Sequence, residues 1–227
     1  MRNARVAKKF DRAAQKNSEY KYDRLLALAN TWMYQDFIKP TDSVLHFWCG
    51  GGYLLNSLVC GDKYGVEPNS KYAADAESTF GIRVGPDFDG FRNLDVVIFM
   101  HTLSQQPNPL QTLTDAHKAL RDGGTLLVVV PCYNHKIKYA ELNFEQHFFS
   151  WSPMDIGNLV HRAGFKVLSD ERICHRIPPK GEPLSRYCNE GLFHLICRIF
   201  GWLFPNQTQI RVVASKTPAT IEPIAGG

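Results

Sequence analysis

The chain has 227 residues, of which 44% are hydrophobic and 21% charged, a composition typical of one globular α/β domain with additions or of two small domains. Its net charge of +4 is too small to indicate nucleic-acid binding, so no nucleic-acid partner is expected. Apolar runs are too short for a membrane span. The 6 cysteines form no CxxC pair and no zinc-finger spacing, which indicates a reducing, cytoplasmic location and no metal site.

Residues 1–40 are predicted to form an N-terminal helical segment that packs on the core. Apolar residues recur at three-to-four spacing from Leu25 to Phe37, and Pro40 ends the pattern. The first sixteen residues are basic and lack the apolar centre of a secretory signal, which favours an exposed basic helix over an organelle transit peptide.

Strand and helix signals then alternate through a domain predicted to span residues 41–216. Short apolar runs rich in β-branched residues predict parallel strands covered on both faces, and their alternation with helices predicts a doubly wound α/β fold. The Asp122-Gly123-Gly124 sequence is predicted to end a helix. The predicted strands are 44–49, 64–67, 82–84, 94–100 and 125–130, and the predicted helices are 53–59, 71–79 and 110–120.

The last third of the chain is less regular. A long loop is predicted for residues 133–150, a helix for 153–162, and two strands from 167 onward and over 209–214. Between these strands, residues 183–204 form an insertion whose apolar run fits a core or lid helix by default, with a dimer face and a membrane-surface helix as alternatives. Residues 217–227 are predicted to be a flexible tail.

Two short sequences carry most of the functional information, SVLHFWCGGG at residues 43–52 and KYGVEPN at 63–69. A buried strand that breaks into a glycine turn before a helix brings main-chain N–H groups close to a ligand. Glu67 closes the next strand, where an acid can accept hydrogen bonds from a ribose. The two features together predict a cofactor that contains a nucleoside, and a nicotinamide dinucleotide is one candidate.

The complete order of motifs resembles the class I S-adenosylmethionine (SAM)-dependent methyltransferases and argues against a nicotinamide-dependent reductase. SVLHFWCGGG corresponds to the family's acid-x-Gly-x-Gly-x-Gly turn, and YGVEPN to its second-strand acid. The later segments LDVVIFMHTLSQQPNPLQTLTDAHKALRDGGTLLVVVP and FEQHFFSWSPMDIGNLVHRAGFKV also match. The resemblance implies a Rossmann-like, mostly parallel seven-stranded sheet with an antiparallel last strand. It also implies methyl transfer from SAM to a small-molecule or carbohydrate-like acceptor.

The resemblance assigns roles to individual residues. Gly50 and Gly52 correspond to the turn beneath the methionine part of SAM, and Glu67 to the ligand of the ribose hydroxyls. Asp87, with Asp89 as an equal competitor, corresponds to the adenine contact. The remaining members of the expected cofactor site are His46, Cys49, Pro68 and Met100.

Two histidines are candidate catalytic bases. His101 follows the strand 94–100 directly, at a position that faces the reaction centre in the family, and a neutral histidine there can accept a proton. His147, in the sequence QHFF, is expected to face the same cleft. Packing beside the cofactor is the alternative role for His101, and anchoring of the loop is the alternative for His147.

Three departures from the family pattern leave the activity open. His46 replaces the acid at the end of the first strand, Trp48 replaces the first glycine, and Leu103-Ser104-Gln105 stands where relatives often have Leu-Glu-His. A protonated histidine would repel the positively charged end of SAM, and a bulky residue fits poorly at a positive φ. A catalytically inactive methyltransferase-like binding or regulatory protein is therefore the alternative to an active enzyme. The acceptor atom and the oligomeric state cannot be predicted from the sequence.

Overall fold

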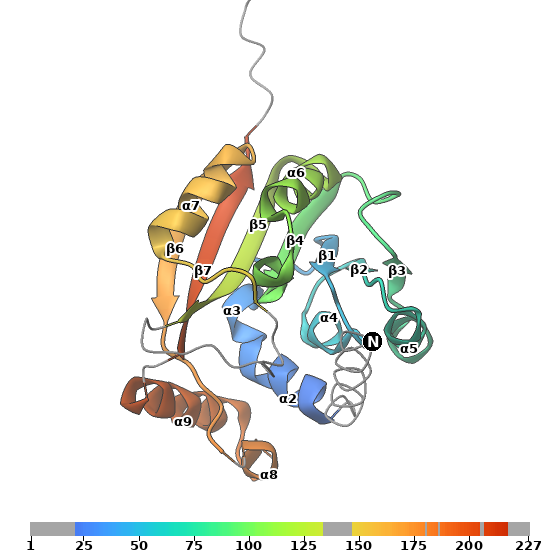
Figure 1. Cartoon of the computed structure of the whole chain (residues 1–227). Coiled ribbons are helices and arrows are strands. Elements are labelled where there is room, and N and C mark those ends of the chain that lie inside the picture. Colours follow the sequence, from blue (N-terminus) through green and yellow to red (C-terminus); the bar gives the residue numbers. More distant parts are fainter. Residues whose placement is uncertain (1–20, 134–146, 180, 186, 205–206, 218–227) are drawn as a thin grey trace, which may run out of the picture.

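The computed structural model describes residues 21–133, 147–179, 181–185, 187–204 and 207–217, and in them a seven-stranded sheet lies between two layers of helices (Figure 1). The strand order is β3-β2-β1-β4-β5-β7-β6. Strands β1 to β5 pair in parallel, whereas β7 runs antiparallel to both β5 and β6. This arrangement confirms the predicted fold class. The strands are β1 Val44–Phe47, β2 Lys63–Val66, β3 Arg83–Gly85, β4 Leu94–Met100, β5 Leu120–Tyr133, β6 Phe165–Ile173 and β7 Gln207–Lys216.

Apolar side chains on both faces of the central strands hold the layers together. Leu45, Phe99 and Val128 point to one face, where they pack with α6 and α7. Val44 and Ile98 point to the opposite face and pack with α3 and α4. Successive residues of a strand alternate between faces, so strands buried on both sides have the continuous apolar runs seen in the sequence. The helices are α2 Lys21–Asn30, α3 Trp32–Gln35, α4 Tyr53–Ser57, α5 Ser70–Phe80, the 3-10 helix η1 Thr102–Gln105, α6 Pro109–Ala119, α7 Pro153–Arg162, α8 Gly181–Ser185 and α9 Glu190–Leu203.

The predicted end of α6 is wrong. The helix ends at Ala119, and the next residue, Leu120, already belongs to β5. The pairing of β4 with β5 jumps from Leu94–Leu120 to Val96–Thr125, so the residues between these pairs form an irregularity in the strand. Gly123 has a φ of 72°, a left-handed conformation that favours glycine. The glycine pair therefore bends a strand and does not cap a helix.

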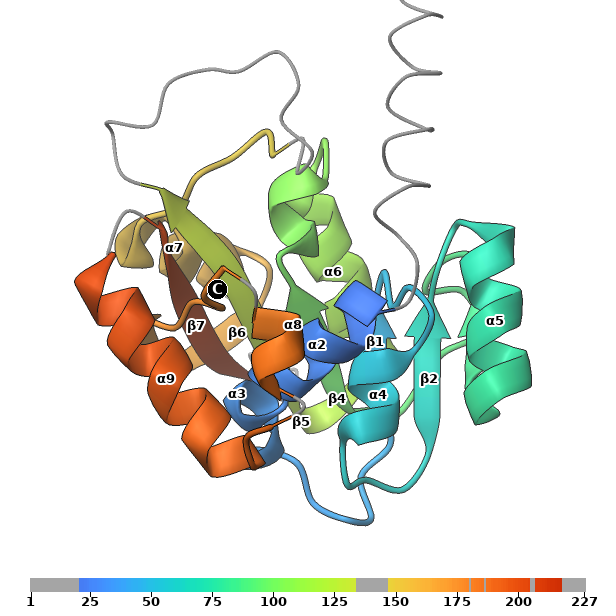
Figure 2. The same ribbon diagram turned by 90° about the horizontal axis from the view of Figure 1, so that it is seen from below.

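The insertion predicted for residues 183–204 falls on α8 and α9, between β6 and β7. Figure 2 shows these helices beside α2, and a small core of Leu25, Ala29, Phe193 and Cys197 joins α9 to α2. In the part of the chain that the structure describes, no helix is both long and apolar enough to cross a membrane.

Several predictions lie partly or wholly outside the described residues. These are the helix over the first twenty residues, most of the loop 133–150, and the tail beyond residue 217. The division of the chain at residue 40 stays a prediction.

Candidate cofactor and acceptor sites

The turn between β1 and α4 has the backbone conformation expected of a ligand-binding glycine loop. Trp48, Gly50 and Gly52 all have positive φ values, of 56°, 55° and 81°. A Cβ added to Gly50 would meet nothing within 4 Å, whereas one added to Gly52 would lie 2.6 Å from Cδ1 of Ile82. Gly50 therefore faces open space, and Gly52 allows the close packing that starts α4.

Glu67 and Gly50 lie in direct contact. The Oε2 atom of Glu67 accepts a hydrogen bond of 2.9 Å from the Gly50 N–H, and Oε1 accepts one of 2.9 Å from the Asn69 N–H. Burial raises the pKa of the Glu67 carboxyl, while these two main-chain donors act in the opposite direction. Each carboxylate oxygen can accept a further hydrogen bond. The two groups that the sequence predicts for one nucleoside therefore lie side by side, and the Gly50 N–H donates to Glu67 rather than toward a ligand.

His46 is buried in β1 near Gly50 and Glu67, and the region around these three residues is called the cofactor corner, or the corner, below. Neither ring nitrogen has a hydrogen-bond partner within the described residues. The ring lines a hollow of about 160 Å³ whose wall includes Leu26, Gly50, Tyr53 and Met100. Burial lowers the pKa of His46 to about 4, so the ring is uncharged at neutral pH. Buried polar groups normally have partners, so these two nitrogens make His46 an unusual residue at the edge of the hollow.

Trp48 borders two cavities. Its indole stacks on Phe47 with ring centroids 5.9 Å apart, and Phe47 in turn stacks on Phe88 at 5.2 Å. Trp48 lines the hollow of His46 and also a second cavity of about 480 Å³. The indole packs against the core on the α6 side of the sheet, and a hollow beside Gly50 is present with the indole in that position.

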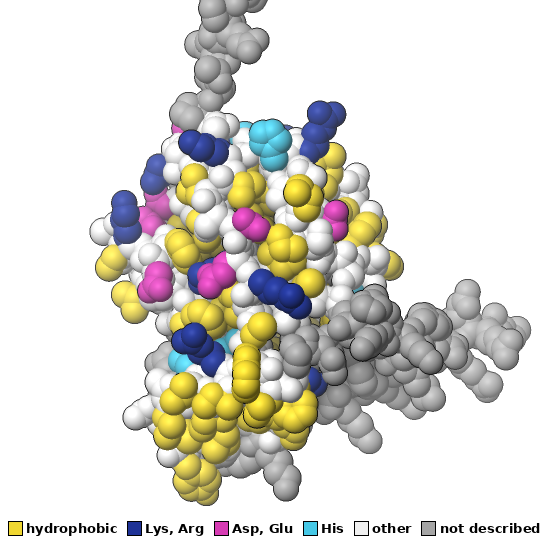
Figure 3. All heavy atoms as spheres, turned by 90° about the vertical axis from the view of Figure 1, so that its left-hand side faces the viewer, with side chains coloured by type: hydrophobic (Ala, Val, Ile, Leu, Met, Phe, Trp, Pro, Cys, Tyr) yellow, Lys and Arg dark blue, Asp and Glu magenta, His cyan; other side chains and the backbone are white. Residues whose placement is uncertain are grey.

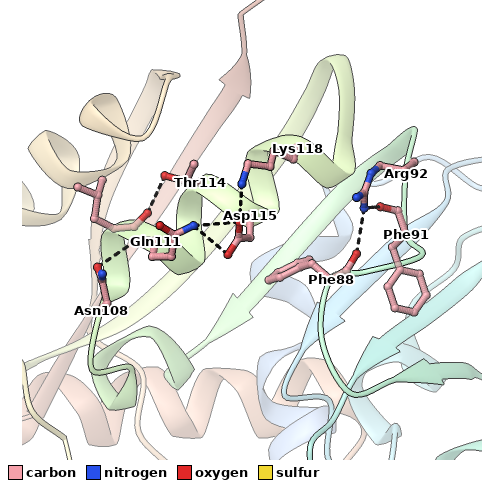
Figure 4. Close-up of polar contacts among 9 residues, drawn as sticks. Phe88, Phe91, Arg92, Asn108, Gln111, Thr114, Asp115 and Lys118 are labelled. Atoms are coloured by element: carbon pink, nitrogen blue, oxygen red, sulfur yellow. Dashed lines mark hydrogen bonds and ion pairs between the residues drawn. The ribbon is translucent and has the colours of Figure 1, made fainter.

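Asp87 and Asp89 both line the second cavity, so the geometry does not distinguish between them as the adenine contact. The Asp89 N–H donates to Oδ1 of Asp87 at 2.8 Å. Figure 4 shows other polar groups near this cavity: Arg92 donates to the carbonyl of Phe88, and Lys118 pairs with Asp115 at 2.8 Å.

The other predicted cofactor residues lie close to the corner. Pro68 follows Glu67 and is exposed. Cys49 is buried with its Sγ atom beside Gly65, and burial raises the pKa of its thiol to about 12. Within the described residues, no group of three or more His, Cys, Asp or Glu side chains could hold a metal ion.

A third cavity, of about 520 Å³, contains both predicted catalytic histidines and is called here the acceptor cavity. It shares Leu26 and Met100 with the hollow of His46, so the two spaces are neighbours. The Tyr133 hydroxyl lies 2.8 Å from Nδ1 of His147. The described polar residues that line the acceptor cavity are Asn30, His101, Gln105, Tyr133, His147, His175, Arg176, Thr208 and Gln209.

A hydrogen-bond chain defines the tautomer of His101. The Gln209 amide nitrogen donates to the carbonyl of His175 at 3.3 Å, so the Gln209 oxygen is the atom 3.0 Å from Nε2 of His101. Because an amide oxygen only accepts, we assign the proton of this contact to Nε2 of His101. Gln209 lies in β7, and nothing in the local sequence around either residue predicts this contact.

The tripeptide Leu103-Ser104-Gln105 contacts the segment before α7 through hydrogen bonds of Ser104. The Ser104 Oγ atom accepts a hydrogen bond of 2.9 Å from the indole of Trp151, and its carbonyl accepts one of 2.8 Å from the Phe148 N–H. Gln105 lines the acceptor cavity. Of these residues, Ser104 therefore has a structural role, and Gln105 borders the candidate acceptor site.

Comparison with known proteins identifies the family. The sequence model of the methyltransferase domain family matches residues 2–170, which is more than half of the chain. The chain therefore belongs to this family, that of the class I SAM-dependent methyltransferases. SAM use follows from family membership. None of the curated proteins compared with the chain matches it significantly.

Solved structures share the fold at low sequence identity. A chain from the complex between the Haloferax volcanii Trm112 methyltransferase activator and a methyltransferase aligns with a TM-score of 0.66 at 19% identity, covering 94% of this chain and 98% of that one. A SAM-dependent methyltransferase of Thermotoga maritima aligns with a TM-score of 0.63 at 18% identity, covering 92% and 98%. One from Archaeoglobus fulgidus aligns at 0.59 and 17%, covering 85% and 94%.

Proposed function

We propose that the protein transfers the methyl group of SAM to a small-molecule or carbohydrate-like acceptor in the acceptor cavity. The observation that carries the proposal is the shared wall of Leu26 and Met100 between this cavity and the hollow of His46. A cofactor in the hollow and an acceptor in the neighbouring cavity would lie next to each other, and group transfer requires such proximity.

The residues at the corner fit SAM. Gly50 faces open space, Glu67 holds a buried carboxylate, and His46 and Gly50 both line the hollow. We assign the ribose to Glu67 and the methionine part to Gly50, Gly52 and His46, with Cys49, Pro68, Asp87 and Met100 completing the site. When bound, SAM supplies an electrophilic methyl group. The uncharged ring of His46 adds no positive charge beside it, because burial lowers its pKa to about 4.

The acceptor cavity is suited to a hydroxyl-bearing molecule. Amide, hydroxyl and imidazole groups line it, and no Asp or Glu does so among the described residues. In the proposed reaction, the His101 imidazole accepts the acceptor's hydroxyl proton, and Gln209 positions the ring through its contact with Nε2. His147, whose Nδ1 atom lies 2.8 Å from the Tyr133 hydroxyl, contributes a second histidine to the lining of the cavity.

A catalytically inactive binding or regulatory protein is the second candidate. Trp48 has a φ of 56°, a conformation that is strained for a bulky residue, and His46 replaces the family acid. Under this interpretation, the corner is a remnant and the native chain does not bind SAM.

Calorimetric titration separates the two candidates. SAM and S-adenosylhomocysteine would be titrated into the native chain and into a His46→Asp/Trp48→Gly double variant. Saturable heat with the native chain supports the proposed function. No heat with the native chain at millimolar ligand, together with heat in the double variant, supports the inactive protein.

A second assay tests the acceptor class. Methyl-labelled SAM would be incubated with the native chain and a panel of free sugars and small phenols, and the label would be followed by chromatography. Transfer to a sugar supports the proposed acceptor. Transfer to phenols alone contradicts the carbohydrate-like class while leaving methyl transfer intact.

A further inference from the structure

One face of α9 is apolar and points away from the rest of the protein. Phe193 and Cys197, on the opposite face, are buried against α2. In Figure 3 hydrophobic side chains form a continuous group over the lower part of the molecule, where α9 lies. The outward side chains recur every three or four residues and are Leu192, Leu195, Ile199, Trp202 and Leu203, followed by Phe204, and all of them are exposed. These six residues are called the α9 stripe below.

Two cations lie beside the α9 stripe. Arg198 is exposed on α9 itself, which begins at Glu190, and the Arg176 guanidinium lies 5.8 Å from the centre of the Phe200 ring of the same helix. In Figure 3 Lys or Arg side chains border the hydrophobic group, while the Asp and Glu side chains in view lie above it. The whole chain carries a net charge of +4.

We propose that the α9 stripe docks the protein onto the surface of a bilayer that contains anionic phospholipid, with α9 lying in the plane of the interface. An apolar helix face that carries tryptophan and is bordered by cations is typical of helices at such interfaces. Trp202, which is 74% exposed, would lie at the level of the head groups. Docking requires no membrane-spanning segment and does not depend on methyl transfer.

A second copy of the chain is a poorer occupant of this face. Stable protein interfaces take about 20–30 residues from each side, whereas the α9 stripe is six residues on one helix. A lid role is also disfavoured, because the stripe points away from the acceptor cavity's lining: none of its residues is among those that line that cavity. Arg176 and Ile177 do line it, so docking through α9 would bring that cavity near the membrane.

Vesicle binding tests this proposal with the full chain. The protein would be sedimented with vesicles of phosphatidylcholine alone and with vesicles that also contain phosphatidylglycerol. We expect binding to the anionic vesicles, weaker binding to the neutral ones, and loss of binding at high salt. The exposed Trp202 should shift its fluorescence emission to the blue when it enters the lipid interface.

Matched substitutions test whether vesicle binding depends on the α9 stripe or on any exposed apolar side chain. Leu195→Glu and Ile199→Glu change residues that are 53% and 50% exposed, and Leu168→Glu changes a leucine on β6 that is 57% exposed. Each α9 substitution should lower the partition coefficient about tenfold, while Leu168→Glu should leave it unchanged.

Three results would overturn the proposal. The first is an absence of binding to either kind of vesicle. The second is equal loss of binding in the Leu195→Glu and Leu168→Glu proteins. The third is dimerisation in light scattering that Ile199→Glu abolishes, which would make a second copy the occupant. If a variant fails to fold, brominated lipid answers the same question when the quenching of tryptophan fluorescence is compared between the native chain and a Trp202→Phe variant. Equal quenching in the two proteins, or none in the native chain, contradicts the proposal.

Discussion

The cofactor corner and the acceptor cavity are neighbours, but different parts of the chain build them. At the corner, Glu67 binds the main chain of Gly50, a residue 17 positions earlier, and both follow adjacent parallel strands. In the acceptor cavity, His101 depends on the side chain of Gln209, which is 108 positions away. The contact between Gly50 and Glu67 therefore follows from strand order and backbone conformation, whereas the contact of His101 depends on long-range side-chain packing.

The largest expected effect concerns the charge of His46. Burial lowers its folded-state pKa from 6.5 to about 4, so the unfolded chain binds a proton in this pH range while the folded protein does not. Stability should therefore fall as the pH drops from 6.5 toward 4, by up to about 3 kcal/mol from this residue. His46→Gln should flatten the slope in urea unfolding measured across that range, whereas His161→Gln, at an exposed position, should leave it unchanged. Equal slopes in all three proteins would contradict the assignment.

The second test removes the carboxylate from the corner. Glu67→Ala deletes two hydrogen bonds from main-chain donors to a charged group, which should cost about 2 kcal/mol of stability. The SAM affinity should fall about 10-fold to 100-fold, because the turn loses its support and the ribose its acceptor. Equilibrium dialysis with labelled SAM measures this, with Glu77→Ala on the exposed side of α5 as control. The proposed role of Glu67 is excluded if both variants bind SAM as the native chain does.

A third test separates the packing role of Gly52 from the ligand role of Gly50. Gly52→Ala, Gly50→Ala and Gly81→Ala all place a side chain at a positive φ, but only the first brings a Cβ to 2.6 Å from another side-chain atom. Gly52→Ala should therefore cost about 1–2 kcal/mol more than Gly81→Ala in thermal unfolding.

Gly50→Ala should resemble Gly81→Ala in stability but weaken SAM binding, since its Cβ would enter the hollow. If Gly50→Ala binds SAM with unchanged affinity, the open space over Gly50 is not the cofactor site.

The smallest effect belongs to the acceptor cavity. Gln209→Leu removes the acceptor that fixes the His101 tautomer, at a cost of about 1 kcal/mol in stability. Nitrogen-15 NMR of the histidine rings should show the Nε2–H form of His101 in the native chain and a mixture of tautomers in the variant. The same mixture in both proteins would remove Gln209 as a positioning residue.

The sequence predicted the fold class and most strands, but not every helix end or side-chain contact. The strand 94–100 was predicted with the bounds of β4, because its apolar run is bounded by clear turn signals. The prediction that Gly123 and Gly124 end α6 was wrong, because a glycine pair is equally compatible with a helix end and with an irregular strand. Contact between Gly50 and Glu67 was predictable because the carboxyl ends of adjacent parallel strands meet.

The hydrogen bonds from Gln209 to His101 and from Trp151 to Ser104 were not predictable. Each joins side chains from distant parts of the chain, and no local pattern of residues specifies which partners meet.

The central claim is that Gly50, Glu67 and His46 form one site for the nucleoside and methionine parts of SAM. A crystal structure of the native chain with saturating S-adenosylhomocysteine tests it most directly. We expect electron density for the ligand in the hollow of His46, with its ribose at the Glu67 carboxylate. Density elsewhere, or a ligand-free hollow filled by the Trp48 indole, would contradict the claim.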